Sequence, residues 1–168
     1  MSAPPPFWTD ALAWSLLLIQ VTLCLHAIGL VMIGLALRRI GVLGDPRTSH
    51  LQVVVVSIAL INGVGLILAV LHGLEATIWA GTYLWLGALS SLHDAILYSV
   101  DSLTARGKVS VTLENNWKLM GALEAANGLL LFGISTAFLF TILTKVWQAL
   151  ARFDPRTGSL EGSERDIG

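Results

Sequence analysis

Three stretches of this chain are almost free of charged residues, and they constrain the fold more than any other feature. Ala11–Leu37 and Thr48–Leu74 contain no Asp, Glu, Lys or Arg, and Leu119–Thr144 contains only Glu124. About 20 consecutive apolar residues suffice for a helix to cross the ~30 Å hydrocarbon core of a bilayer. Each stretch is therefore long enough to form a transmembrane helix.

The composition of the whole chain agrees with a membrane protein. Of the 168 residues, 55% are hydrophobic and only 12% are charged, whereas about 25% are charged in an average soluble domain. The net charge of −1 gives no reason to expect a nucleic-acid partner. Cys24 is the only cysteine, which excludes a disulfide framework and a cysteine-based metal site. We therefore expect an all-α integral membrane protein that is surrounded by lipid.

Charged and turn-forming residues divide the chain into segments. The N-terminal segment, 1–10, carries three prolines but no Lys or Arg, so it lacks the positive start of a secretory signal peptide. Asp45-Pro46 and nearby glycines predict a loop over 38–50. The tail, 148–168, has too few apolar residues to fold and is predicted to be disordered. Transmembrane helices are predicted over three ranges, which are 11–37, 51–74 and 119–147.

Residues 75–92 admit two assignments. A helix over 51–92 would have 42 residues and a length of about 63 Å, twice the thickness of a bilayer core. Either a break near Gly73 or Gly81 makes 75–92 an interfacial or extended helix, or Ala76–Leu92 is a further span.

The positive charges favour three crossings over four. Arg38, Arg39 and Arg47 lie between the first two stretches, and further basic residues follow the third. Three crossings place both basic segments in one compartment, as the positive-inside rule requires, whereas four would separate them. We therefore predict an extracytoplasmic N-terminus and a cytoplasmic C-terminus.

The segment from Ser90 to Leu131 has an unusual order of elements. A short amphipathic helix is followed by a polar loop containing Arg106, Gly107 and Lys108, and then by the third apolar stretch. A half-length helix, a polar loop and a full span follow one another in this way in a re-entrant pore loop. Bilayers tolerate non-helical backbone at depth only where it is buried in protein or lines water. We therefore predict a pore helix and loop over 93–118.

Asp94–Ala137 resembles, without a gap, the pore region of small bacterial potassium channels of the "ion channel" type. Their last helix reads roughly E-W-R-L-L-G-x-L-E-A-x-N-G-L-L-L-F-G-x-S-T-A. The resemblance implies a homotetramer in the bacterial inner membrane, in which each chain has three transmembrane helices and a re-entrant loop. It also implies that this homotetramer conducts inorganic ions and needs no cofactor. The matching residues are Ala95, Tyr98 and Ser99 on the pore helix, and Trp117, Gly121, Leu123–Ala125, Asn127, Gly128 and Gly133–Ala137 on the last helix.

The filter sequence departs from that family. Where the family has T-T-L-G-Y-G-D, this chain has Thr104, Ala105, Arg106, Gly107, Lys108, Val109 and Ser110. A potassium filter coordinates the ion with backbone carbonyls, and its left-handed backbone positions favour glycine. Gly107 keeps one such position, but β-branched Val109 takes the other and Ala105 removes a hydroxyl ligand. We therefore predict a pore that is not potassium-selective, and is non-selective or anion-permeable.

The two basic residues of this loop allow two interpretations. In a tetramer, Arg106 and Lys108 could form rings that face the axis and select anions. Alternatively they pair behind the loop with Asp101, and Asp94, Glu114 and Lys118 bring the local net charge to zero. If the pair is buried, removing one partner costs ~3–5 kcal/mol.

Four residues of the last helix are candidate functional positions. Glu124 and Asn127 match the family pattern, so Glu124 is interpreted as a hydrogen-bonded contact to the pore helix or a neighbouring subunit, with a pore-lining role as the alternative. Gly128 and Gly133 act either as a gating hinge or as sites of close helix packing.

The histidines suggest a second, weaker hypothesis. His72 and Glu75 lie one turn apart, a spacing that metal ligands also use on helices. We interpret them as a hydrogen-bonded pair, and His26 as a satisfied core histidine. No nucleophile and base are spaced for catalysis, so an enzyme is not expected. The sequence therefore predicts a tetrameric ion channel. The alternatives are a non-conducting structural or regulatory membrane subunit, and a membrane enzyme or metal transporter that uses His72, Glu75 and Glu124.

Overall fold

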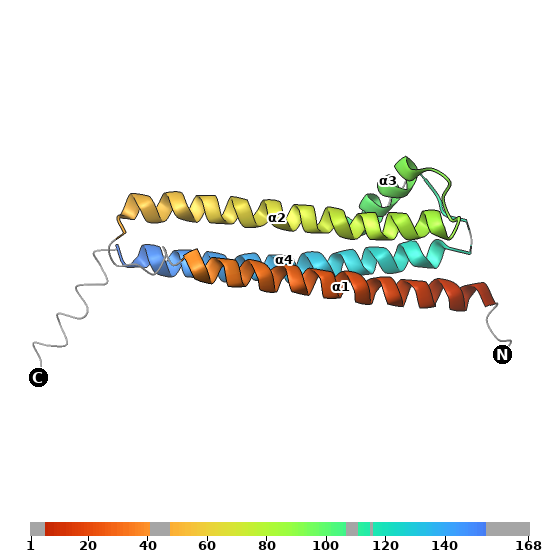
Figure 1. Cartoon of the computed structure of the whole chain (residues 1–168), viewed down its shortest axis with the longest axis horizontal. Coiled ribbons are helices and arrows are strands. Elements are labelled where there is room, and N and C mark those ends of the chain that lie inside the picture. Colours follow the sequence, from red (N-terminus) through yellow and green to blue (C-terminus); the bar gives the residue numbers. More distant parts are fainter. Residues whose placement is uncertain (1–5, 41–47, 107–110, 115, 154–168) are drawn as a thin grey trace, which may run out of the picture. The chain divides into compact units, whose positions relative to one another are not determined.

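The computed structural model describes residues 6–40, 48–106, 111–114 and 116–153, and it is all-helical over these ranges. Its four helices are α1 (Pro6–Ile40), α2 (His50–Trp85), α3 (Leu92–Leu103) and α4 (Lys118–Ala151) (Figure 1). Three of them are long and apolar enough to cross a membrane, over Thr9–Arg39, His50–Trp85 and Lys118–Ala151. The prediction of an all-α protein with three such helices is confirmed.

The long helices expose apolar side chains and bury polar ones. Ile28, Leu66 and Phe140 are 62%, 68% and 69% exposed, whereas His26 and Glu124 are fully buried. A water-soluble helix bundle has the opposite pattern, with charged residues outside and large apolar patches covered. The outer surface of these helices therefore suits lipid.

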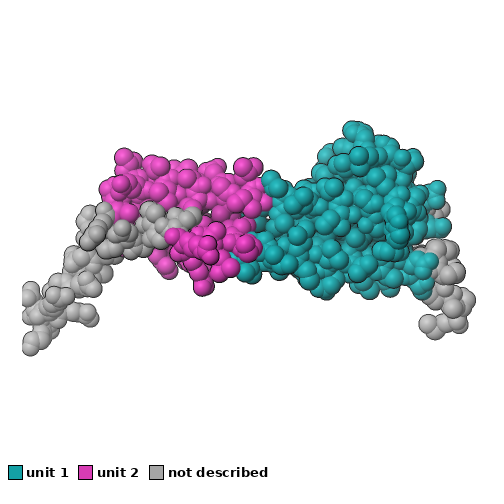
Figure 2. Space-filling model, viewed as in Figure 1, with its two compact units in different colours: residues 1–31, 68–135 teal, residues 32–67, 136–168 magenta. Residues whose placement is uncertain are grey.

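Two compact units make up the chain, and Figure 2 colours them separately. Unit 1 comprises Met1–Val31 and Leu68–Ser135, and unit 2 comprises Met32–Ile67 and Thr136–Gly168. In unit 2, the buried apolar residues come from all three long helices, and the ring of His50 meets that of Phe153 edge-on at 5.2 Å. They are Ile33, Val53, Val64, Ile142, Val146 and Ala149.

Unit 1 has an aromatic core and contains α3. Trp79 and Tyr83 of α2 are fully buried there together with Met120 of α4, and Tyr98 of α3 packs edge-on against Tyr83 at 5.3 Å. A second cluster joins Leu103, at the end of α3, to α2 and α4. The short helix is therefore part of the core of this unit.

The expected break near Gly73 or Gly81 is wrong, because α2 continues through both glycines to Trp85. Neither glycine has a positive φ, and a Cβ at either would meet no atom within 4 Å beyond the backbone of its own helix. The buried side chains of Trp79 and Tyr83 give the last turns of α2 a core to pack against. At ~1.5 Å per residue, its 36 residues are about 54 Å long, so residues 75–85 form an extended helix.

The chain turns after α2 and not within it. Gly87 has a φ of 67°, in the left-handed region that glycine adopts without strain. The amides of Ala88 and Leu89 both donate to the carbonyl oxygen of Tyr83, at 2.9 and 3.3 Å. Residues 86–91 therefore form a turn that leads into α3.

Other helix ends also differ from the sequence-based boundaries. Helix α1 begins at Pro6, inside the expected N-terminal segment 1–10, and α4 continues to Ala151, past the expected start of the tail at 148. The predicted disorder of the tail concerns mainly 154–168, which lie outside the described residues, as do 41–47 of the predicted loop.

Candidate functional site

The start of α3 carries a standard helix N-cap. Ser91 has an extended backbone, and its hydroxyl accepts a hydrogen bond from the amide of Asp94 at 3.4 Å. The Asp94 carboxylate lies in the first turn, where the positive end of the helix dipole favours a negative charge. Local chemistry therefore explains both the position and the role of Asp94, which makes no ion pair among the described residues.

The end of α3 is a Schellman motif. The amide of Ala105 donates to the carbonyl oxygen of Ser102 at 2.8 Å, and that of Arg106 donates to the carbonyl oxygen of Asp101 at 3.1 Å. Ala105 has a φ of 52°, the left-handed conformation that this motif requires and that glycine usually supplies. The polar loop therefore begins at Thr104, the helix C-cap, whose hydroxyl donates to the carbonyl oxygen of Val100 at 2.7 Å.

Arg106 pairs with Asp101, as the second interpretation of the loop expected. Its guanidinium lies 2.8 Å from the Asp101 carboxylate, and the side chains are 69% and 11% exposed. Because Arg106 is mostly exposed, this is not the fully buried pair for which a cost of ~3–5 kcal/mol was expected. Glu114 is exposed and makes no ion pair within the described ranges. Gly107, Lys108, Val109 and Ser110 lie outside the described residues, so the predictions for them stay predictions.

Glu124 of α4 is fully buried and holds α3 in place. The hydroxyl of Ser99 on α3 forms a hydrogen bond with one oxygen of the Glu124 carboxyl group, and the hydroxyl of Tyr83 on α2 donates to the other at 2.7 Å. Ser99 also lies 2.8 Å from the carbonyl oxygen of Ala76 on α2. Glu124 therefore makes the contact to the short helix that the sequence suggested.

Two glycines of α4 let α3 approach closely. A Cβ on Gly128 would collide with the carbonyl group of Leu103, and a Cβ on Gly121 would overlap the Tyr98 hydroxyl. A Cβ on Gly133 would meet no atom within 4 Å beyond the backbone of its own helix. Close packing therefore accounts for Gly128, whereas no contact among the described residues accounts for Gly133. Asn127, one turn from Glu124, is buried and donates its amide to the Thr22 hydroxyl on α1 at 2.9 Å.

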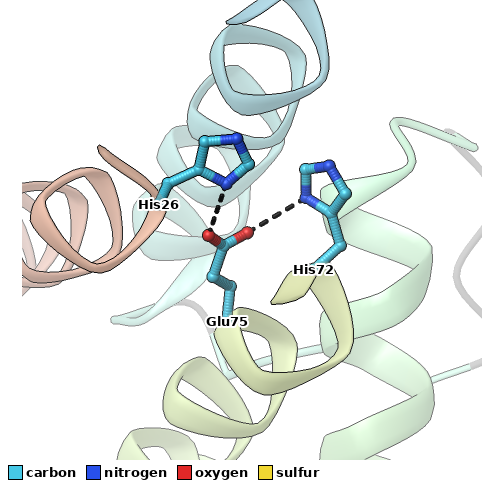
Figure 3. Close-up of side chains that lie close together, drawn as sticks. All are labelled: His26, His72 and Glu75. Atoms are coloured by element: carbon cyan, nitrogen blue, oxygen red, sulfur yellow. Dashed lines mark hydrogen bonds and ion pairs between the residues drawn. The ribbon is translucent and has the colours of Figure 1, made fainter. Parts of the chain in front are cut away.

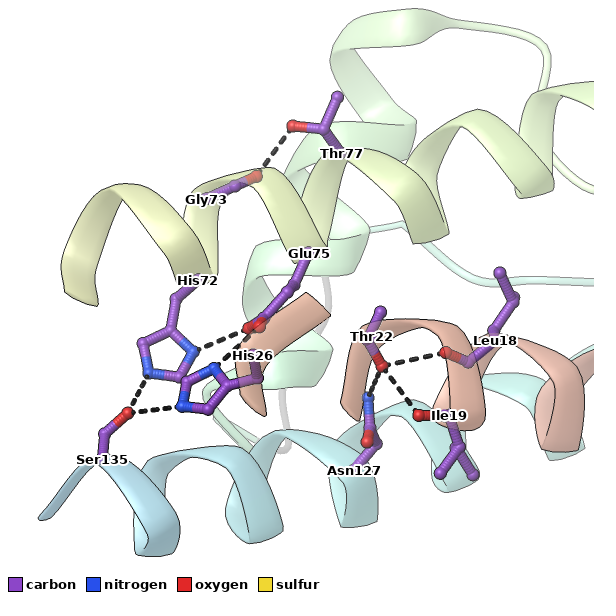
Figure 4. Close-up of polar contacts among 10 residues, drawn as sticks. All are labelled: Leu18, Ile19, Thr22, His26, His72, Gly73, Glu75, Thr77, Asn127 and Ser135. Carbon is purple, nitrogen blue, oxygen red and sulfur yellow. Dashed lines mark hydrogen bonds and ion pairs between the residues drawn. The ribbon is translucent and has the colours of Figure 1, made fainter. Parts of the chain in front are cut away.

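Four polar side chains form a closed ring in the core of unit 1 (Figure 4), and Figure 3 shows three of them, His26, His72 and Glu75. The Glu75 carboxylate lies 2.8 Å from Nδ1 of His26 and 3.0 Å from Nδ1 of His72. The Nε2 atoms of His26 and His72 lie 3.0 and 3.2 Å from the hydroxyl of Ser135. The two imidazole rings are 5.1 Å apart. Residues from α1, α2 and α4 therefore meet in one buried polar cluster, which we call the histidine ring.

The histidine ring contains only part of what the sequence suggested. The expected His72–Glu75 hydrogen bond is present, and His26 is a fully buried histidine with a hydrogen-bond partner at each ring nitrogen. Glu124, the third residue of the metal-transporter hypothesis, lies elsewhere, against Ser99 and Tyr83. No local pattern in the sequence connects His26 or Ser135 with Glu75. The available signal was a histidine inside the first uncharged stretch and a carboxylate directly after the second.

Comparisons with known proteins do not assign this arrangement to a family. No family model, no curated protein and no solved structure matches the chain. The function therefore has to be argued from the geometry of the chain itself.

Proposed function

We propose that this chain is the subunit of a tetrameric ion channel in which α3 is a pore helix and the loop after it forms a filter that does not select potassium. Four copies are needed because one chain supplies a single pore loop and cannot enclose a pathway alone. The chain would lie in the bacterial inner membrane with its C-terminus in the cytoplasm, as the basic residues favour.

The observation that carries this proposal is the order of contacts between α3 and α4. Along α3, Tyr98 approaches Gly121, Ser99 bonds to Glu124, and Leu103 reaches Gly128. Helix α3 therefore runs in the same direction as α4, from the start of α4 towards its middle. The contacts on α4 extend from Gly121 to Gly128, which is seven residues or about 10 Å along the helix. Helix α3 ends beside Gly128, whereas α4 begins at Lys118, so the chain comes back to the start of α4 between these two helices. A segment that enters and returns in this way is what a re-entrant loop requires.

The length of α3 supports the same conclusion. Its 12 residues span about 18 Å, which is too short to cross a ~30 Å hydrocarbon core. Its buried face carries three of the residues on which the family resemblance rests, Ala95, Tyr98 and Ser99. Polar groups buried between apolar helices are typical of functional or partnered positions in membranes.

The filter sequence is the reason to propose altered selectivity. The left-handed residue of the described loop is Ala105, and its strain is used to end α3. Arg106 is neutralised by Asp101, so its charge does not by itself favour anions. We therefore favour a non-selective pathway over an anion-selective one.

Ion flux through liposomes that contain the purified full-length chain tests this function. We expect flux without preference for potassium over sodium, carried by an assembly whose cross-linked mass corresponds to four copies. A reversal potential that follows the potassium gradient alone would contradict the altered filter. A four-copy assembly without flux would identify the chain as the non-conducting subunit instead.

A pair of charge variants then locates the pathway. Arg106→Gln removes a charge in the loop, and Arg39→Gln removes one at the exposed end of α1, far along the chain from α3. If the loop lines the pathway, Arg106→Gln changes the anion-to-cation permeability ratio more than Arg39→Gln does. Equal effects of the two variants would argue against the loop as the filter.

A further inference from the structure

The histidine ring has no place in the proposed pore, yet it contains the donor atoms of a metal site. One ligand atom from each of His26, His72 and Glu75 lies within 4.8 Å of the other two. A four-coordinate zinc ion with bonds of ~2.1 Å holds its ligand atoms ~3.4 Å apart, so side-chain adjustments of about 1 Å would suffice. The backbone already brings the three ligands together.

The hydrogen atoms of the ring do not suffice for all four contacts when Glu75 is ionised. Four contacts join Glu75, His26, Ser135 and His72 in a closed cycle, and each hydrogen bond requires one hydrogen atom. With Glu75 ionised and both imidazoles neutral, the side chains supply only three hydrogen atoms, one from each imidazole and one from the Ser135 hydroxyl. The same state leaves a net negative charge in a fully buried carboxylate. A metal ion bound to both Nδ1 atoms and to Glu75 needs no hydrogen atom at these contacts, and it balances that charge.

Ser135 prepares the histidines for a metal in particular. When both imidazoles keep their hydrogen on Nε2, the Ser135 oxygen can accept both hydrogen bonds with its two lone pairs. Both Nδ1 lone pairs then point to the side on which Glu75 lies. Metal-bound histidines in proteins are held in this manner, with the second ring nitrogen donating to a fixed acceptor.

The geometry points to a binding site for a divalent transition-metal ion, with Nδ1 of His26, Nδ1 of His72 and a Glu75 carboxylate oxygen as ligands. Imidazole nitrogen suits zinc, cobalt and nickel, whereas magnesium and calcium prefer oxygen ligands. Two histidines and one glutamate leave a fourth position open, as three-ligand zinc sites do. The ion would link α1 to α2 and, through Ser135, to α4.

Zinc titration of the metal-stripped, full-length chain in detergent tests this site. We expect saturable binding of one Zn²⁺ per chain by calorimetry. His26→Ala and His72→Ala should abolish saturable binding, and Ser135→Ala should weaken it about 10–100-fold.

The other two histidines and the cysteine supply matched controls. His50 and His93 are exposed and lie outside the ring, and Cys24 is an exposed thiol two residues before His26. His50→Ala, His93→Ala and Cys24→Ala should each leave zinc binding unchanged. Loss of zinc binding in any of these controls would overturn the assignment. Unchanged zinc binding in both His26→Ala and His72→Ala would also overturn it.

Cobalt spectroscopy of the unmodified chain keeps the test independent of whether the variants fold. Co²⁺ at this site should give the visible bands of a four- or five-coordinate ion without a thiolate charge-transfer band. A thiolate band would place the metal at Cys24 and refute the proposal. Absence of saturable zinc and cobalt binding would refute the site.

Discussion

Replacing Gly128 with alanine tests whether α3 is seated on α4 as closely as described. The added Cβ would lie 2.7 Å from the carbonyl carbon of Leu103 and 2.8 Å from its Cα. Carbon atoms pack at ~3.5–4.0 Å, so the end of α3 would have to move by about 1 Å. Because the opposing atoms belong to the backbone, no side-chain rotation can relieve the collision.

The expected effect on stability combines two opposing terms. Overpacking of a core costs about 1–3 kcal/mol, whereas alanine in place of glycine inside a helix gains about 1 kcal/mol. Gly133→Ala in the same helix meets no atom within 4 Å, so it should show the gain alone. The two variants should therefore differ by about 1–3 kcal/mol in the free energy of unfolding, with Gly128→Ala the less stable.

Denaturant-induced unfolding of both variants in detergent measures this difference. Limited proteolysis between α3 and α4 should also be faster in Gly128→Ala, because a displaced α3 exposes its flanking loop. A difference in unfolding free energy below about 0.5 kcal/mol, smaller than any ordinary overpacking effect, would refute the close contact between Gly128 and Leu103.

Substitutions at three further positions test individual contacts. Ala105→Gly should raise the free energy of unfolding by about 1 kcal/mol, because glycine adopts the left-handed cap without strain, and a decrease would contradict the Schellman motif. Asp101→Asn should lower the free energy of unfolding by no more than about 1 kcal/mol, because Arg106 is 69% exposed. A larger decrease, measured by thermal unfolding, would mean that assembly buries the Asp101–Arg106 pair. Glu124→Gln should change the free energy of unfolding by less than about 1 kcal/mol, because the amide can bond to both Ser99 and Tyr83, whereas Glu124→Leu should cost about 1–3 kcal/mol by leaving the Tyr83 hydroxyl unsatisfied. Equal stability of the two Glu124 variants would contradict these contacts.

Local features of α3 could be predicted well from the sequence. The short amphipathic helix was predicted because the spacing of its apolar residues reflects interactions within one or two turns. The pairing of Asp101 with Arg106 is also local, because the Schellman motif brings these two residues together. These predictions depended on short-range chemistry and needed no knowledge of helix packing.

The course of α2 could not be decided in that way. Gly73 and Gly81 are signals for a break, but helix propensity is a weak term of about 1 kcal/mol per glycine. Burial of Trp79 and Tyr83 in the core of unit 1 outweighs it, since a fully buried large side chain contributes about 1.5–3 kcal/mol. Tertiary packing therefore determined where α2 ends.

The sequence by itself determined that three helices of this chain can cross a membrane, because hydrophobicity and length are sums over consecutive residues. Only the tertiary structure decided which polar residues inside those helices meet. His26 and Ser135 are separated by 109 positions, and His26 and Glu75 by 49. Whether such residues touch depends on the rotation and axial shift of each helix against its neighbours, and a shift of one residue rotates a side chain by about 100°. No local pattern encodes that alignment, so the histidine ring became visible only in the folded chain.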